Sequence, residues 1–110
     1  MPDVFPTPIT MLPLAEIPLD GVRGYLLQGE RQQLLFMEFS EDVALPEHSH
    51  EAQWGVVLEG RIDLLIDGDR HTFAKGDRYY IPAGVSHSAR IHAGYADITY
   101  FDAPDRYGLK

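Results

Sequence analysis

"HSHEAQWGVVLEG", residues 48–60, is the stretch that decides the fold of this chain. It starts with two histidines one residue apart and continues into an apolar segment that ends at Gly60. Residues i and i+2 of a β-strand project from the same face, so the His48 and His50 imidazoles would lie together and could reach one cation. The competing interpretation is a solvent-exposed strand whose polar residues stand between two acidic ones, Glu47 and Glu51.

A second stretch, "GDRYYIPAGVSHSARI" at residues 76–91, favours the metal-binding interpretation. It places His87 after a turn marked by Pro82 and Gly84. Two histidines from one strand and a third from a distant strand would form a ligand set for a metal of borderline softness. The chain has no cysteine, so imidazole, carboxylate or amide groups must hold any metal.

Composition limits the class of protein. The chain has 110 residues with 45% hydrophobic content, which predicts one globular domain. Its formal charge of -8 repels phosphate backbones and anionic lipid, so we expect neither nucleic acid nor a membrane as a partner. Asp3 stands where a signal peptide needs positive charge, and no apolar region follows it. We therefore expect a cytoplasmic protein that binds a small molecule.

Short apolar runs separated by turn signals predict β-strands and little helix. The Asp67-Gly68 pair predicts a tight hairpin, because glycine accepts the positive φ that such turns require. Strands at this spacing are typical of an antiparallel barrel or sandwich. The runs cover residues 22–29, 31–40, 53–60, 61–68, 70–77, 78–84, 86–94 and 96–103.

Residues 1–18 carry five of the eight prolines and show no sustained periodicity. We interpret them as an extended arm or edge strand of the same domain. Residues 19–110 then form a single barrel domain.

The stretch around the paired histidines resembles the first motif of the cupin superfamily, and in particular its small single-domain bacterial members. That motif consists of Gly, five residues, His-x-His, three or four residues, Glu, six residues and Gly. This chain has His48 and His50, then Gln53, six further residues and Gly60. It departs from the motif in having Gln in place of Glu and Asp42 in place of the first Gly.

The later stretch resembles the second cupin motif, which consists of Gly, five residues, Pro-x-Gly, two residues, His, three residues and Asn. This chain has Gly76, then Pro82 and Gly84, then His87, while Ile91 replaces the final Asn. The resemblance covers residues 48–91, and the flanking strand pattern extends it over most of the chain.

This resemblance implies an all-β fold, the antiparallel double-stranded β-helix or jelly-roll barrel, with little helix. It also implies one divalent metal ion, either Zn, Ni, Fe or Mn, inside the barrel. The implied ligands are His48, His50, Gln53 and His87, with Glu51 as the rival fourth ligand. A turn or bulge must lie before Gln53, because a regular strand would point it away from His50. We expect the other two histidines, His71 and His92, to be solvated.

Candidate catalytic and pocket residues come from the late strand and from aromatic or acidic side chains on other strands. Alternation along residues 96–103 sends Asp97, Thr99 and Phe101 to one face and Ile98, Tyr100 and Asp102 to the other. Proton transfer needs a nearby base, and the candidates are Asp97, Tyr100 and Glu38. The side chains that we expect at the substrate pocket are Phe36, Glu38, Trp54 and Tyr80.

The resemblance implies a fold and a site but no single reaction, so we consider three functions. The first is a small metalloenzyme with isomerase or lyase chemistry on a polar or carboxylated, sugar-acid-like substrate, similar to cupins that ketonise unsaturated uronates. The second is an Fe(II)-dependent dioxygenase, and the third is a metal- or ligand-binding module without enzymatic activity, such as a sensor. We also expect a homodimer in which the arms pair with the neighbouring barrel.

Overall fold

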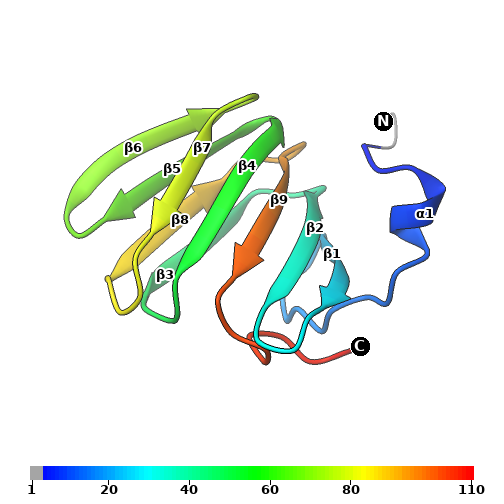
Figure 1. Cartoon of the computed structure of the whole chain (residues 1–110). Coiled ribbons are helices and arrows are strands. Elements are labelled where there is room, and N and C mark those ends of the chain that lie inside the picture. The colour runs from blue at the N-terminus through cyan, green and yellow to red at the C-terminus, as the bar shows by residue number, and fades with distance from the viewer. Residues whose placement is uncertain (1–3) are drawn as a thin grey trace.

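The computed structural model describes residues 4–110, which form nine strands and one short helix, α1 (Thr7–Thr10) (Figure 1). Residues 1–3 of the predicted arm lie outside this part of the chain. The strands are β1 (Val22–Gln28), β2 (Gln33–Phe39), β3 (Val43–His48), β4 (Gln53–Glu59), β5 (Arg61–Ile66), β6 (Asp69–Ala74), β7 (Arg78–Ile81), β8 (His87–Ile91) and β9 (Ala96–Phe101).

The strands form two antiparallel sheets that enclose the core. One sheet has the order β1-β2-β9-β4-β7 and the other has the order β3-β8-β5-β6, so the chain crosses between the sheets repeatedly. Figure 1 shows the two sheets as the walls of one barrel-like body. The predicted all-β jelly-roll fold is confirmed. The core side chains include Leu35, Val57, Ile62, Leu64, Ile81, Ile91 and Phe101.

Strand alternation explains why these residues are buried. Every second residue of β2 faces the core, beginning with Gln33, and Leu35 in its centre is 0% exposed. Burying one leucine side chain in this way contributes about 1.5–3 kcal/mol. The residues between them, Leu34, Phe36 and Glu38, face outward and are only partly buried.

The hairpin between β5 and β6 has the predicted turn. Asp67 and Gly68 have φ values of 48° and 84°, the left-handed conformation that both central residues of a type I′ turn require. This turn matches the right-handed twist of the strands that it joins.

Residues 13–15 and the C-terminal residue lie on the side of β1 (Figure 1). The Leu26 amide donates to the Pro13 carbonyl at 2.8 Å, and the Ala15 amide donates to Gly24 at 2.9 Å. The Lys110 amide in turn donates to the Leu14 carbonyl at 2.9 Å. These bonds satisfy the edge strand β1, which would otherwise present unpaired backbone groups. Within residues 4–110 no helix has the length and apolar character needed to cross a bilayer.

Candidate metal centre

Three histidines, from two strands and the loop after the first of them, converge between the sheets. His48 ends β3, His87 begins β8, and the two are register partners. His50 lies in the loop that follows β3. The ring centroids are 4.3 Å apart for His48 and His87, 4.8 Å for His50 and His87, and 5.3 Å for His48 and His50. Their ligand nitrogens all lie within 4.8 Å of one another.

Two irregularities in the backbone bring these rings together. The pairing of β3 with β8 shifts between Leu45 and His48, as in a β-bulge. Residues 49–52 then form a loop, and β4 begins at Gln53. Gln53 lines the same cavity as the histidines, which places the required turn between His50 and Gln53.

Each histidine has its Nδ1 atom held by a backbone carbonyl. His48 Nδ1 lies 2.7 Å from the Pro46 oxygen, His50 Nδ1 lies 2.7 Å from the Glu51 oxygen, and His87 Nδ1 lies 3.0 Å from the Val85 oxygen. A carbonyl can only accept, so each Nδ1 carries the proton and each neutral ring keeps the lone pair on Nε2. Metal-binding histidines show this arrangement, in which a backbone carbonyl holds the ring and selects its tautomer.

The surroundings favour the neutral imidazole that a metal requires. Burial lowers the pKa of His50 and of His87, because a buried ring loses the hydration of its charged form. The positive charge of Arg106 and the neighbouring imidazoles lower both pKa values further. A neutral ring with a free Nε2 is a ligand for a divalent cation.

A small cavity of about 60 Å³ connects the histidines with the end of β9. Its polar lining comes from β3 and the loop that follows it, from β4, β7, β8 and β9, and from the segment after β9, and apolar core residues form the rest of the wall. The polar lining residues are His48, His50, Gln53, Tyr79, His87, Asp97, Thr99, Arg106 and Tyr107.

Asp97 lies in this lining with both carboxylate oxygens hydrogen-bonded. Tyr79 and Tyr95 donate to Oδ2 at 3.0 and 2.6 Å, and Thr99 donates to Oδ1 at 2.8 Å. Burial raises the pKa of Asp97 to about 6, although the three hydroxyl groups act in the opposite direction. Gln53 Nε2 donates to the Tyr79 hydroxyl at 3.3 Å, so one hydroxyl joins the amide to the carboxylate.

The alternation expected for residues 96–103 is present in β9. Asp97, Thr99 and Phe101 are buried at the cavity, whereas Tyr100 faces outward and is 36% exposed. The prediction of Tyr100 as a catalytic residue is therefore corrected, because its side chain lies on the face of the strand away from the histidines.

Trp54 and Tyr80, expected at the substrate pocket, also lie on the outer face. They are 40% and 57% exposed, and they pair with each other across β4 and β7. Trp54 pairs with Tyr100 on its other side, so strand parity directs all three away from the cavity.

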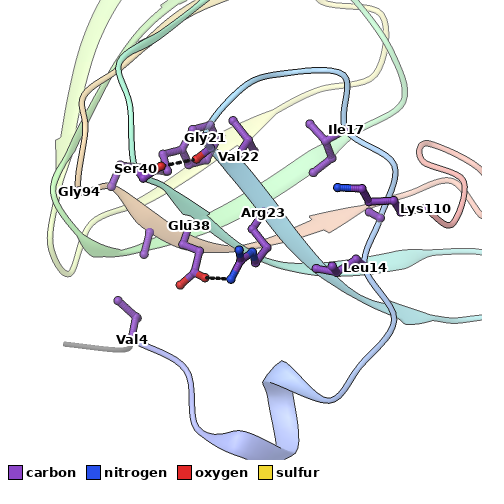
Figure 2. A pocket seen from close by; sticks show the side chains of 14 residues that line it. Val4, Leu14, Ile17, Gly21, Val22, Arg23, Glu38, Ser40, Gly94 and Lys110 are labelled. Carbon is purple, nitrogen blue, oxygen red and sulfur yellow. Dashed lines mark hydrogen bonds and ion pairs between the residues drawn. The ribbon is translucent and has the colours of Figure 1, made fainter. Parts of the chain in front are cut away.

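Phe36 and Glu38 on β2 are corrected in the same way. Phe36 packs against Phe5 of the N-terminal arm, with ring centroids 5.6 Å apart. Glu38 accepts a hydrogen bond from the Tyr25 hydroxyl at 3.3 Å and lines a different pocket of about 400 Å³. Figure 2 shows Glu38 there beside Arg23, with the segment that carries α1 below them in this view.

The other candidate ligands lie outside the cluster. Glu51 is exposed and does not line the cavity, although its carbonyl holds His50. His71 is exposed on β6, as expected. His92 is partly buried and lies 2.7 Å from an Asp63 carboxylate oxygen at the surface.

Three polar residues at or beside the site were not predicted from the sequence. Tyr79 and Tyr95 reach Asp97 from β7 and from the turn before β9, and Arg106 enters the cavity from the segment after β9. For Tyr79, strand alternation relative to the exposed Arg78 and Tyr80 was the signal that could have placed it inside.

Comparison with known proteins gives one family. Residues 35–102 match the family described as Cupin domain. Over 67 residues, 59% of this chain, the sequence is 33% identical to quercetin 2,3-dioxygenase of Bacillus subtilis (strain 168). The match covers 20% of that protein, so the chain spans about a fifth of the length of this curated relative.

Two solved structures share the fold. An RmlC-like cupin from Shewanella frigidimarina NCIMB 400 matches with a TM-score of 0.72 and 24% identity over 86% of each chain. Oxalate decarboxylase from Bacillus subtilis matches with a TM-score of 0.69 and 19% identity, over 87% of this chain and 28% of that one. At these identities the structural likeness establishes the two-sheet barrel.

Proposed function

The chain belongs to the cupin domain family, and from that membership we propose that it is a metal-dependent enzyme acting on a small carboxylated molecule. The proposed reaction is an isomerase- or lyase-type proton transfer on a sugar-acid-like substrate. The observation that carries the proposal is the common hydrogen bonding of the three histidines, whose Nδ1 atoms all lie on backbone carbonyls.

We assign His48, His50, His87 and Gln53 as the ligands of one divalent ion. The three imidazoles keep Nε2 free for a metal. The Gln53 amide donates through Nε2 to Tyr79, which leaves its Oε1 atom as the fourth donor. All four ligands are neutral, so the ion keeps its full charge. Bound there, it would supply Lewis acidity toward a carbonyl or carboxylate oxygen of the substrate.

Asp97 is the residue that we assign as proton acceptor. A raised pKa of about 6 suits a group that gains and loses a proton near neutrality. Burial and the Asp97 charge raise the pKa of Tyr79, so its hydroxyl stays protonated. This hydroxyl touches both Asp97 and Gln53, and it provides the contact between the carboxylate and the ligand set.

The test of the metal site is a measurement of metal content. The His48→Ala/His50→Ala double variant is expected to lose the ion and keep its fold, because both rings lie at the edge of the core. His71→Ala is the matched control, since His71 is exposed on β6 and should leave metal content unchanged. Elemental analysis of the purified proteins and circular dichroism are the two readouts. Full metal content in the double variant would refute the assignment.

Oxygen-dependent chemistry is the second candidate function. The 33% identity to quercetin 2,3-dioxygenase favours it, although the match covers 20% of that protein. The same histidines can hold Fe(II), whereas the facial triad of many non-haem iron oxygenases includes a carboxylate ligand. Oxygen uptake by the iron-loaded protein with quercetin would support this function. Proton exchange on a keto or enol acid without oxygen uptake would support the first.

We further propose that the protein is a homodimer. A row of apolar side chains crosses the outer face of the five-stranded sheet in continuous register. Four of its members are at least 36% exposed, and a second copy of the same face would cover them through a two-fold interface. The row consists of Leu27, Leu34, Tyr100, Trp54 and Tyr80.

A further inference from the structure

A guanidinium group enters the cavity from the segment that follows β9. Arg106 lines the cavity, and it is the only lysine or arginine among the described residues that do so. Its Nε atom is buried and has no hydrogen-bond partner within residues 4–110. None of the ion pairs in that part of the chain involves Arg106. A buried N–H group without an acceptor is costly, so this donor lacks the partner that a purely structural role would supply.

Aromatic rings hold the guanidinium close to the histidines. Its central carbon lies 4.5 Å from the Tyr107 ring centroid and 5.6 Å from that of Phe101. The same Phe101 ring lies 5.6 Å from the His50 ring. One aromatic side chain therefore contacts both the cation and a proposed metal ligand. Stacking on rings orients the plane of the guanidinium but leaves its N–H groups free to bind in that plane.

The backbone next to Arg106 is anchored by a buried glutamine. Gln33 is 1% exposed, and its Nε2 donates to the Tyr107 carbonyl at 2.8 Å. Its Oε1 accepts from the Tyr107 amide at 3.0 Å, so one side chain holds both backbone groups of the residue after Arg106. A cation on an anchored segment loses little conformational entropy when it binds a ligand.

We propose that Arg106 binds the carboxylate group of an anionic ligand in this cavity. The proposal deepens the proposed function and rests on it for the identity of the site. Arginine presents paired N–H donors that match the two oxygens of a carboxylate. In a chain of net charge -8, a partly buried cation in the lining favours entry of an anion into the cavity. The group nearest to Arg106 would then be the substrate carboxylate, with the reacting end toward the histidines and Asp97.

The test compares a carboxylate with its neutral amide. Pyruvate and pyruvamide are titrated into metal-free protein, and binding is followed by the amide shifts of residues around the cavity in ¹⁵N NMR spectra. Wild-type protein should bind pyruvate more tightly than pyruvamide. Arg106→Gln should weaken pyruvate binding about tenfold, the loss of one charge-assisted contact, and leave pyruvamide binding unchanged. Arg31→Gln removes the same charge from an exposed turn and should bind both as wild type does.

Arg106→Lys covers the case in which Arg106→Gln does not fold. It keeps the charge without the planar donor pair and should bind pyruvate more weakly than wild type. Wild-type affinity for pyruvate in Arg106→Gln, or equal binding of pyruvate and pyruvamide by wild type, would overturn the proposal. Metal content is measured on the proteins as purified and after addition of divalent ions, before metal is removed for the titrations. A wild-type protein that binds no divalent ion but whose pyruvate binding depends on Arg106 would refute the metalloenzyme and leave this proposal standing.

Discussion

Burial and hydrogen bonding have opposite effects on the pKa of Asp97. Three hydroxyl groups donate to its carboxylate, yet loss of hydration is the larger effect and raises the pKa to about 6. A carboxylate in this state can be neutral or ionised near neutral pH, and its proton has a direct neighbour in the Tyr79 hydroxyl. The raised pKa also makes the stability of the folded protein depend on pH.

We predict that ionisation of Asp97 lowers stability as the pH rises. The folded protein binds this proton more tightly than the unfolded chain, whose carboxyl ionises near 3.8. The free energy of unfolding should therefore gain most from Asp97 below about pH 4 and lose that contribution as the pH rises through about 6. Asp97→Asn cannot ionise. Relative to wild type its stability should increase by up to ~3 kcal/mol between pH 4 and pH 7.

Urea unfolding of both proteins across this range measures the difference. Taking the difference also cancels the titration of His50 and His87, whose lowered pKa values make the folded protein lose stability as the pH falls. Parallel stability curves for the two proteins would show that folding does not raise the pKa of Asp97, and would contradict the prediction.

Some residues of the site could be predicted from the sequence and others could not. His48, His50 and His87 are predictable from the spacing of the two motifs, although His50 lies in the loop after β3 and not on the strand from which its position was predicted. The carbonyls that hold them are backbone groups, so the residue types do not predict these hydrogen bonds. Arg106 is a single arginine in an irregular segment, and its place in the cavity depends on a long-range contact between Gln33 and Tyr107.

Strands β4 and β7 approach each other closely at one point. Gly55 on β4 pairs with Tyr79 on β7, and a Cβ atom on Gly55 would lie 2.6 Å from the Tyr79 hydroxyl. The absence of a side chain there makes room for the ring whose hydroxyl reaches Asp97 and Gln53. The strand pairing thus determines the position of a group in the site.

We predict that Gly55→Ala moves Tyr79 and loosens the site. The added methyl group should cost roughly 1–3 kcal/mol of stability, as other overpacked cores do. It should also weaken metal binding, because the displaced hydroxyl no longer orients the Gln53 amide. Gly108→Ala is the control, since a Cβ there meets nothing within 4 Å and the backbone is not left-handed. Chemical denaturation and metal titration measure the two effects, and unchanged metal affinity in Gly55→Ala would contradict this role for Tyr79.

Strand periodicity separates the two faces of a strand but does not by itself show which one points inward. On β9 each alternating set mixes polar and apolar residues, so the sequence offers both Asp97 and Tyr100 as candidates, and only the structure shows that the Asp97 set faces the cavity. On β2 both alternating sets are largely apolar, so the pattern does not show that Leu35 and Met37 face inward and Phe36 outward. Which face of β2 points inward depends on the register of β2 with β9, and this register cannot be predicted from a single sequence.

The outer face of the five-stranded sheet carries a row of apolar side chains, although the chain as a whole is strongly acidic. In the row from Leu27 to Tyr80, all five side chains are apolar or aromatic, although the chain has 17 acidic residues. The arm covers only part of this face, where Phe5 packs on Tyr25 and Phe36. A second copy packed against the remaining row would remove these side chains from water. The free energy of association becomes more favourable as the apolar area covered increases.

We predict that Tyr80→Glu prevents the proposed dimer from forming. Tyr80 is 57% exposed, so the variant should fold as wild type does, but the two-fold interface would bury two added carboxylates. His71→Glu adds the same charge on the opposite sheet and should remain dimeric. Light scattering measures the mass of each protein. Trp54, the only tryptophan, offers a second readout, because its emission should shift to longer wavelength when dilution exposes it. A wild-type protein that is monomeric at every concentration tested would exclude this interface.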